Sequence, residues 1–169
     1  IYLSYMQTPV LDQFESLLQE RFPTKVKSVE QLYDIVCATV TLDVLKDVMH
    51  FLKDSGYSFL TTLNAVHYPN QTEKFAMVYH LHDLQNNLRI RVKAYTTSDH
   101  PSFPTITDIF EAADWMERQE YDFFGIHFTG HKNLKRILNM DNLEGWPLRK
   151  EYPLEDQARF DKDDKMFGR

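Results

Sequence analysis

The chain has 169 residues, enough for one domain with a substantial single core. Its 43% hydrophobic and 14% aromatic content is typical of a globular protein. Its formal net charge of -6 argues against broad nucleic-acid binding through a basic face and against a polybasic membrane anchor. The single cysteine, Cys37, excludes a disulfide within the chain and cannot supply the set of thiolates of an ordinary iron–sulfur cluster.

The first third of the sequence predicts two helices and two strands. Apolar residues at helical spacing over residues 8–22 indicate a helix that begins at a Thr-Pro pair. Residues 26–29 and 32–40 are typical of strands. A second helix is expected to begin with Thr41 as its N-cap, and Gly56 is well placed to end it.

The middle of the sequence predicts three more strands and a third helix. The strands are expected over residues 59–68, 74–84 and 88–97. The last of them alternates strictly between apolar and polar residues, which is typical of a half-buried strand. We expect the third helix to begin at Thr105 or Thr107.

This order of elements predicts an α+β fold. The expected architecture is a two-layer α/β arrangement in which a mixed sheet carries helices on one face, followed by an irregular C-terminal extension. We expect a single domain in residues 1–143 and an extended arm in residues 144–169 that packs on a partner.

The stretch over residues 117–154 interleaves charged residues, aromatics and glycines without a period of a helix or a strand, so we expect specific contacts to hold it. Its carboxylates have two interpretations. Glu117, Glu120 and Asp122 could act as an acid and a base. The favoured hypothesis pairs them with Arg118 and Arg136 in a structural charged network, because such networks also perturb pKa values.

Two histidines in the same stretch also have two interpretations. His127 and His131 are four residues apart, a spacing that can ligate zinc on a helix. However, they flank Gly130 in a segment that is not expected to be helical, so ordinary hydrogen-bonding roles are favoured. A stand-alone hydrolase that uses His127 and His131 with a nearby carboxylate is the corresponding functional alternative.

The residues of this stretch follow a long, irregular pattern. The positions that carry it are Asp114, Trp115, Glu117, Arg118, Tyr121, Asp122, Gly125, Ile126, Phe128, Gly130, His131, Leu134, Arg136, Ile137 and Leu138, followed by the run Glu144-Gly145-Trp146-Pro147-Leu148-Arg149-Lys150-Glu151-Tyr152-Pro153-Leu154. The pattern resembles the signature of the C subunit of proton-pumping NADH:quinone oxidoreductase, respiratory complex I. Gln119 and Lys132 depart from it, since the family usually carries a glutamate and a proline there.

The resemblance implies a structural subunit of the peripheral arm, with no catalytic, cofactor-binding or metal-binding residue of its own. In that family, electrons from NADH pass through FMN and iron–sulfur clusters in partner subunits to quinone, while protons are pumped. The implied partners are the large quinone-site subunit and the terminal-cluster subunit. The implied location is the cytoplasmic (or matrix or stroma) side of an energy-transducing membrane.

The resemblance also implies which residues form or support the subunit interface. They are Glu117, Arg118, Tyr121, Asp122, Gly125, Phe128, Gly130, His131, Arg136, Trp146, Leu148, Arg149, Tyr152 and Pro153. A close alternative is the homologous subunit of a membrane-bound hydrogenase or of a ferredoxin-linked complex.

Overall fold

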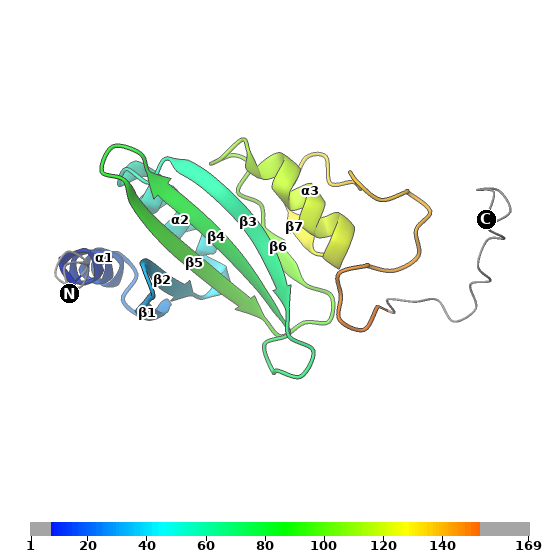
Figure 1. Ribbon diagram of the computed structural model, residues 1–169, viewed down its shortest axis with the longest axis horizontal. Coiled ribbons are helices and arrows are strands. Elements are labelled where there is room, and N and C mark those ends of the chain that lie inside the picture. Colours follow the sequence, from blue (N-terminus) through cyan, green and yellow to red (C-terminus); the bar gives the residue numbers. More distant parts are fainter. Residues whose placement is uncertain (1–7, 153–169) are drawn as a thin grey trace, which may run out of the picture.

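The computed structural model describes residues 8–152 (Figure 1). The helices are α1 (Thr8–Arg21), α2 (Leu45–Asp54) and α3 (Ala113–Phe124), and a short 3-10 helix, η1 (Leu42–Val44), precedes α2. The strands are β1 (Val26–Leu32), β2 (Ile35–Val40), β3 (Phe59–His67), β4 (Phe75–Asp83), β5 (Leu88–Thr96), β6 (Ser102–Pro104) and β7 (His127–Thr129).

Five of the strands form one mixed sheet in the order β1-β2-β5-β4-β3. The pair β2 and β5 is parallel, whereas the other neighbouring pairs are antiparallel. The short strands β6 and β7 pair in parallel as a separate sheet. The predicted α+β fold with a mixed sheet is therefore confirmed.

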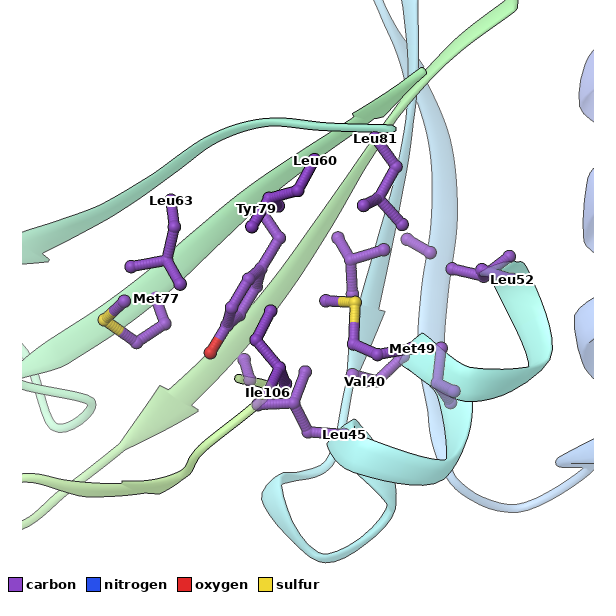
Figure 2. Close-up of a cluster of buried hydrophobic side chains, with 14 of the residues drawn as sticks. Val40, Leu45, Met49, Leu52, Leu60, Leu63, Met77, Tyr79, Leu81 and Ile106 are labelled. Carbon is purple, nitrogen blue, oxygen red and sulfur yellow. The ribbon is translucent and has the colours of Figure 1, made fainter. Parts of the chain in front are cut away.

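The core lies between one face of this sheet and the helices. Along β4 the side chains of Phe75, Met77, Tyr79 and Leu81 all point to this face and are fully buried. Figure 2 shows that α2 turns its own apolar stripe, which includes Met49, towards the same cluster. The alternation of apolar and polar residues thus decides which sheet face the helices cover. The opposite face carries polar side chains, among them Arg89, Arg91 and Lys93 of β5.

Two segments differ from the expectation. The third helix begins at Ala113 rather than at Thr105 or Thr107, because the preceding residues form turns that place Ile106 and Ile109 in the core. The expected strand over residues 32–40 is interrupted at Tyr33, whose φ of 58° reverses the chain between β1 and β2. Thr41 does precede η1 and α2, but its side chain makes no capping hydrogen bond.

Within the part of the chain that the structure describes, no helix is both long and apolar enough to cross a bilayer.

Candidate functional site

Helix α3 buries four charged residues, Glu117, Arg118, Glu120 and Asp122. Such side chains are seldom fully buried unless they are paired or hydrogen-bonded. Each of the four contacts a segment outside the helix, and these contacts define the candidate site. Helix α3 lies beside β3, and the chain that follows β7 runs back along it (Figure 1).

Asp122 holds the segment that follows β7. One carboxylate oxygen accepts the backbone N–H groups of Ile137, Leu138 and Asn139 at 3.1, 2.8 and 2.9 Å. The other accepts the Asn139 amide and the Arg136 guanidinium at 3.1 and 3.0 Å. Burial by itself raises the pKa of Asp122, but the N–H groups of residues 137–139 more than offset burial and hold the pKa well below its ordinary value. Asp122 is therefore a charged clamp.

Arg118 holds the same segment from its carbonyl side. Its guanidinium donates to the backbone oxygens of Lys135 and Arg136, both at 3.3 Å, and lies 5.0 Å from the ring centroid of Trp115. Arg118 thus completes the clamp by satisfying carbonyl groups, whereas Asp122 satisfies N–H groups. The two side chains bond to residues 135–139, and we call these residues together with the adjoining Met140 the clamped segment.

Glu117 and Glu120 hold two other elements without any cation. Glu117 accepts the Thr105 hydroxyl at 2.6 Å and the Ile106 N–H at 2.8 Å. Glu120 accepts the N–H of Ala65, on β3, at 2.9 Å. Burial raises the pKa of each glutamate from about 4.5 to about 7, and these hydrogen bonds oppose the rise only in part.

The predicted charged network is therefore correct only for Asp122 and Arg136. Neither Glu117, Glu120 nor Arg118 forms an ion pair within residues 8–152. The sequence pattern could not show this, because the partners of these side chains are mainly backbone groups, which every sequence contains. Gln119, which replaces the usual glutamate of the family, lies exposed on α3.

Trp146 fits a slot beside the C-terminal end of α3. Its ring lies edge-on to Tyr121, with centroids 5.5 Å apart, and under the guanidinium of Arg136 at 4.7 Å. Gly125 forms the C-cap with a φ of 69°, and a Cβ atom there would overlap the indole. Glycine is thus required by both the backbone angle and the aromatic neighbour.

The residues after Trp146 also contact the chain's own domain. The Leu148 N–H donates to the oxygen of Phe123 at 3.1 Å. The Arg149 guanidinium donates to the oxygen of Phe124 at 2.6 Å and lies 5.0 Å from the ring centroid of Phe75. The start of the expected arm, residues 146–152, thus packs on the domain itself. Whether the arm also contacts a partner stays a prediction.

The remaining signature residues have structural positions. The Phe128 side chain is buried in the core, and Gly130 has a φ of 89° in the turn after β7. The Tyr152 ring lies against Gly145. Pro153 lies outside the described residues.

The two histidines of the hydrolase alternative lie in different environments. Nε2 of His131 lies 3.3 Å from a carboxylate oxygen of Asp114, and its Nδ1 accepts the N–H of Asn133 at 3.0 Å. His127, by contrast, is exposed on β7. Within residues 8–152, no group of three or more histidine, cysteine, aspartate or glutamate side chains is arranged to hold a metal ion.

The clamped segment exposes large apolar side chains. Leu138 and Met140 are 65% and 70% exposed, although the backbone at Leu138 is fixed by Asp122. Trp115, on α3, and Leu148 are also exposed. Met140 could not be recognised as a site residue from the sequence, because the carboxylate that fixes its segment lies on another element. We call Trp115, Leu138, Met140 and Leu148 the exposed apolar residues of the site.

The fold and the site together define an α+β domain in which buried charged side chains fix a surface segment. The model of the family described as "Respiratory-chain NADH dehydrogenase, 30 Kd subunit" matches residues 38–158, and the chain belongs to this family. A curated relative, the C subunit of the NADH-quinone oxidoreductase of Citrifermentans bemidjiense, is 42% identical over 143 residues, which cover 84% of this chain and 89% of the relative.

Two solved structures are similar to this chain. One, described as "Nqo5 of the trypsin-resistant fragment (1-134)", has a TM-score of 0.64 and 29% identity, and the match covers 72% of this chain and 99% of that chain. The other, from a membrane-bound sulfane sulfur reductase described as an archaeal respiratory membrane complex, has a TM-score of 0.75 over 90% of this chain and 95% of that chain. At 24% identity, this likeness shows a common fold alone.

Proposed function

We propose that the chain is a structural subunit in the peripheral arm of a proton-translocating NADH:quinone oxidoreductase. It carries no redox cofactor, whereas FMN and iron–sulfur clusters belong to its partners. The observation that carries this proposal is the clamp. Asp122 and Arg118 use buried charge to hold a backbone segment, and that segment presents Leu138 and Met140 to the outside.

Exposed apolar side chains on a fixed backbone suit a protein interface, because little conformational entropy is lost on association. Large aliphatic residues that stay exposed on a single domain, with no partner to cover them, favour aggregation. We propose that Leu138 and Met140 pack against the large quinone-site subunit. The terminal-cluster subunit is the proposed second neighbour.

The proposed absence of a cofactor is supported by the single thiol. Cys37 is buried on β2, and burial raises the pKa of its thiol, so the thiolate that would ligate iron is disfavoured. The proposed location is the side of the membrane where NADH is available, the cytoplasmic (or matrix or stroma) side.

The alternative is the homologous subunit of a membrane-bound hydrogenase or of a ferredoxin-linked complex. The fold shared with a chain of the sulfane sulfur reductase is compatible with this alternative. Isolation of the tagged chain from membranes in mild detergent distinguishes the two. We expect a flavin-containing NADH-oxidising module and NADH:quinone reductase activity in the isolate. A complex that oxidises ferredoxin or hydrogen and does not oxidise NADH would overturn the proposal.

The variant Arg118→Ala tests whether the role is structural. It removes the donor to the carbonyl groups of Lys135 and Arg136, and we expect less assembled complex but an unchanged apparent KM for quinone in the complex that does form. Gln119→Ala, at the exposed neighbouring position on α3, is the matched control; it removes only a long hydrogen bond of 3.4 Å to Glu120 and should assemble normally. Normal assembly of Arg118→Ala with a raised KM for quinone would contradict the structural role.

A further inference from the structure

The sheet face opposite the helices carries a row of cations along β5. Arg89, Arg91 and Lys93 alternate with buried residues, so all three point to this face, which we call the open face. None of them forms an ion pair within residues 8–152. By contrast, Lys25, Lys27, Lys46 and Lys74 each pair with a carboxylate elsewhere on the chain.

The strand register explains why these cations lack carboxylates. On β4, His82 is opposite Arg89, His80 is opposite Arg91 and Val78 is opposite Lys93. On the other side, β2 places Cys37 beside Arg91. Glu30 lies opposite Cys37 on β1 and is thus two strands, or about 10 Å, from Arg91, and Glu73, which acts on Tyr95, is paired with Lys27. The row along β5 is therefore a local strip of positive charge in a chain whose formal net charge is -6.

Arg91 is held in one orientation. Its Nε donates to Nε2 of His80 at 2.8 Å, and the Nδ1 of His80 lies 2.9 Å from the Thr62 hydroxyl. Burial, followed by the neighbouring Arg91 and Lys93, lowers the pKa of His80, so at neutral pH the imidazole is neutral and its Nε2 can accept. The terminal nitrogens of Arg91 make no hydrogen bond within residues 8–152 and are free to bind a carboxylate with two parallel hydrogen bonds.

The face is also hollowed beside these cations. A hollow of about 340 Å³ is lined by Asp34, Ile35, Thr61, Thr62, His80, Leu81, Arg89 and Arg91. Two guanidinium groups, hydroxyl groups and an oriented imidazole thus converge on one recess. Asp34 adds a carboxylate to this lining, but it forms no ion pair with a cation of residues 8–152. Arg91, which His80 already holds, loses little side-chain entropy when it binds an acceptor.

We infer that the open face is a second docking surface, on which Arg89, Arg91 and Lys93 receive an acidic polypeptide segment of a neighbouring subunit. This inference rests on the proposed function, because it assumes that the chain works within a complex. The open face lies on β3, β4, β5 and β2, whereas the clamped segment lies on α3. The two surfaces can therefore engage different partners.

A protein segment suits this face better than a membrane or a nucleic acid. Both of those are extended anionic surfaces, and the net charge of -6 would repel them at long range. A short acidic segment avoids this repulsion, since it meets only the local row of cations.

Zero-length crosslinking of the assembled complex tests the inference. A carbodiimide joins an amine to a carboxylate in direct contact, and Lys93 is the amine of this row. We expect Lys93 to be linked to an aspartate or glutamate of another subunit. The double variant Arg89→Gln/Arg91→Gln keeps this amine as a reporter and should lower the yield of that link roughly tenfold.

The variant Arg21→Gln/Lys46→Gln is the matched control. It removes two positive charges from the helical layer and should leave the yield at Lys93 unchanged. The inference is overturned if Lys93 is unlinked in the wild-type complex, if it links only to Glu30 of its own chain, or if the control lowers the yield equally. Binding of the wild-type chain, but not of the first double variant, to phosphatidylglycerol vesicles would also overturn it, in favour of a membrane site.

Failure of the proposed function looks different from failure of this inference. If the tagged wild-type chain does not co-purify with other subunits, the proposed function fails. If it co-purifies and Lys93 remains unlinked, only the docking surface fails. Circular dichroism of both double variants shows whether they are folded.

Discussion

At the scale of single residues, this chain uses buried charge to organise backbone. Asp122 receives three successive N–H groups, Arg118 donates to two successive carbonyl groups, and Glu120 receives the N–H of Ala65 on β3. Hydrogen bonds to charged groups are stronger than those between neutral groups, and loss of one partner leaves the other buried without compensation. These side chains are therefore expected to be sensitive to small chemical changes.

Asp122→Asn tests the clamp. The amide keeps the size of the side chain but removes the charge that pairs with Arg136 and accepts the N–H groups of residues 137–139. We expect a loss of about 3 kcal/mol in the free energy of unfolding, measured with urea, and faster tryptic cleavage after Lys135 and Arg136. Asp141→Asn, at an exposed position, is the matched control. Equal stability and equal rates of tryptic cleavage in the two variants would show that Asp122 does not fix the clamped segment.

Glu117 and Glu120 make the stability depend on pH near neutrality. Their pKa is about 7 in the folded chain and near 4.5 when it is unfolded, so between these values the folded state binds more protons. Stability therefore falls as pH rises from about 4.5 to about 7, by up to about 3 kcal/mol for each group. The stabilising contribution of the two protonated glutamates is fully present below the pKa of the unfolded chain and is lost once pH exceeds the pKa of the folded chain.

Glu117→Gln/Glu120→Gln should flatten this dependence. The measurement is the difference between wild type and variant in the free energy of unfolding at pH 5, 6, 7 and 8. This difference is needed because His67 and His80, whose pKa values are lowered, first by burial, give a slope of the opposite sign. We expect the free energy of unfolding of the variant to increase relative to that of wild type as pH rises. A difference that does not change with pH would refute the raised pKa values.

At the scale of elements, the sequence was informative where side-chain pattern alone decides structure. Strand β5 was predicted almost to the residue, because its alternation reports which side chains face the helices. The start of α3 was predicted too early, because Thr105 looks like a helix cap while its hydroxyl in fact donates to Glu117. Local pattern cannot distinguish these roles, since the choice depends on a partner on another element.

The end of α3 gives a second test at this scale. Gly125→Ala places a Cβ atom in a left-handed conformation and against the Trp146 ring, whereas Gly130→Ala meets a similar backbone angle but only the Thr105 methyl at 3.3 Å. The backbone cost, roughly 1–2 kcal/mol, is common to both. We expect Gly125→Ala to be the less stable and to shift the fluorescence of Trp146, measured with Trp115 replaced by Phe. Equal melting temperatures and an unchanged spectrum would argue against the Trp146 slot.

At the scale of the whole molecule, the irregular signature identified the family before the fold was known, yet it did not show the purpose of each residue. Asp122, Gly125 and Trp146 were expected at or behind an interface, and in the structure they hold the chain's own C-terminal segment. The exposed Leu138 and Met140 depend on them. Signature residues thus include both supporting side chains, such as Asp122, and exposed ones, such as Leu138, and only three-dimensional contacts separate the two.

The measurement that tests the central claim most directly is assembly of the double variant Leu138→Ser/Met140→Ser. Both side chains are exposed, so the free energy of unfolding of the isolated chain should change by less than about 1 kcal/mol. We predict that the tagged variant nevertheless loses most of the co-purified quinone-site subunit. A variant that melts like wild type and still assembles at wild-type levels would contradict the claim that the clamped segment is the docking site.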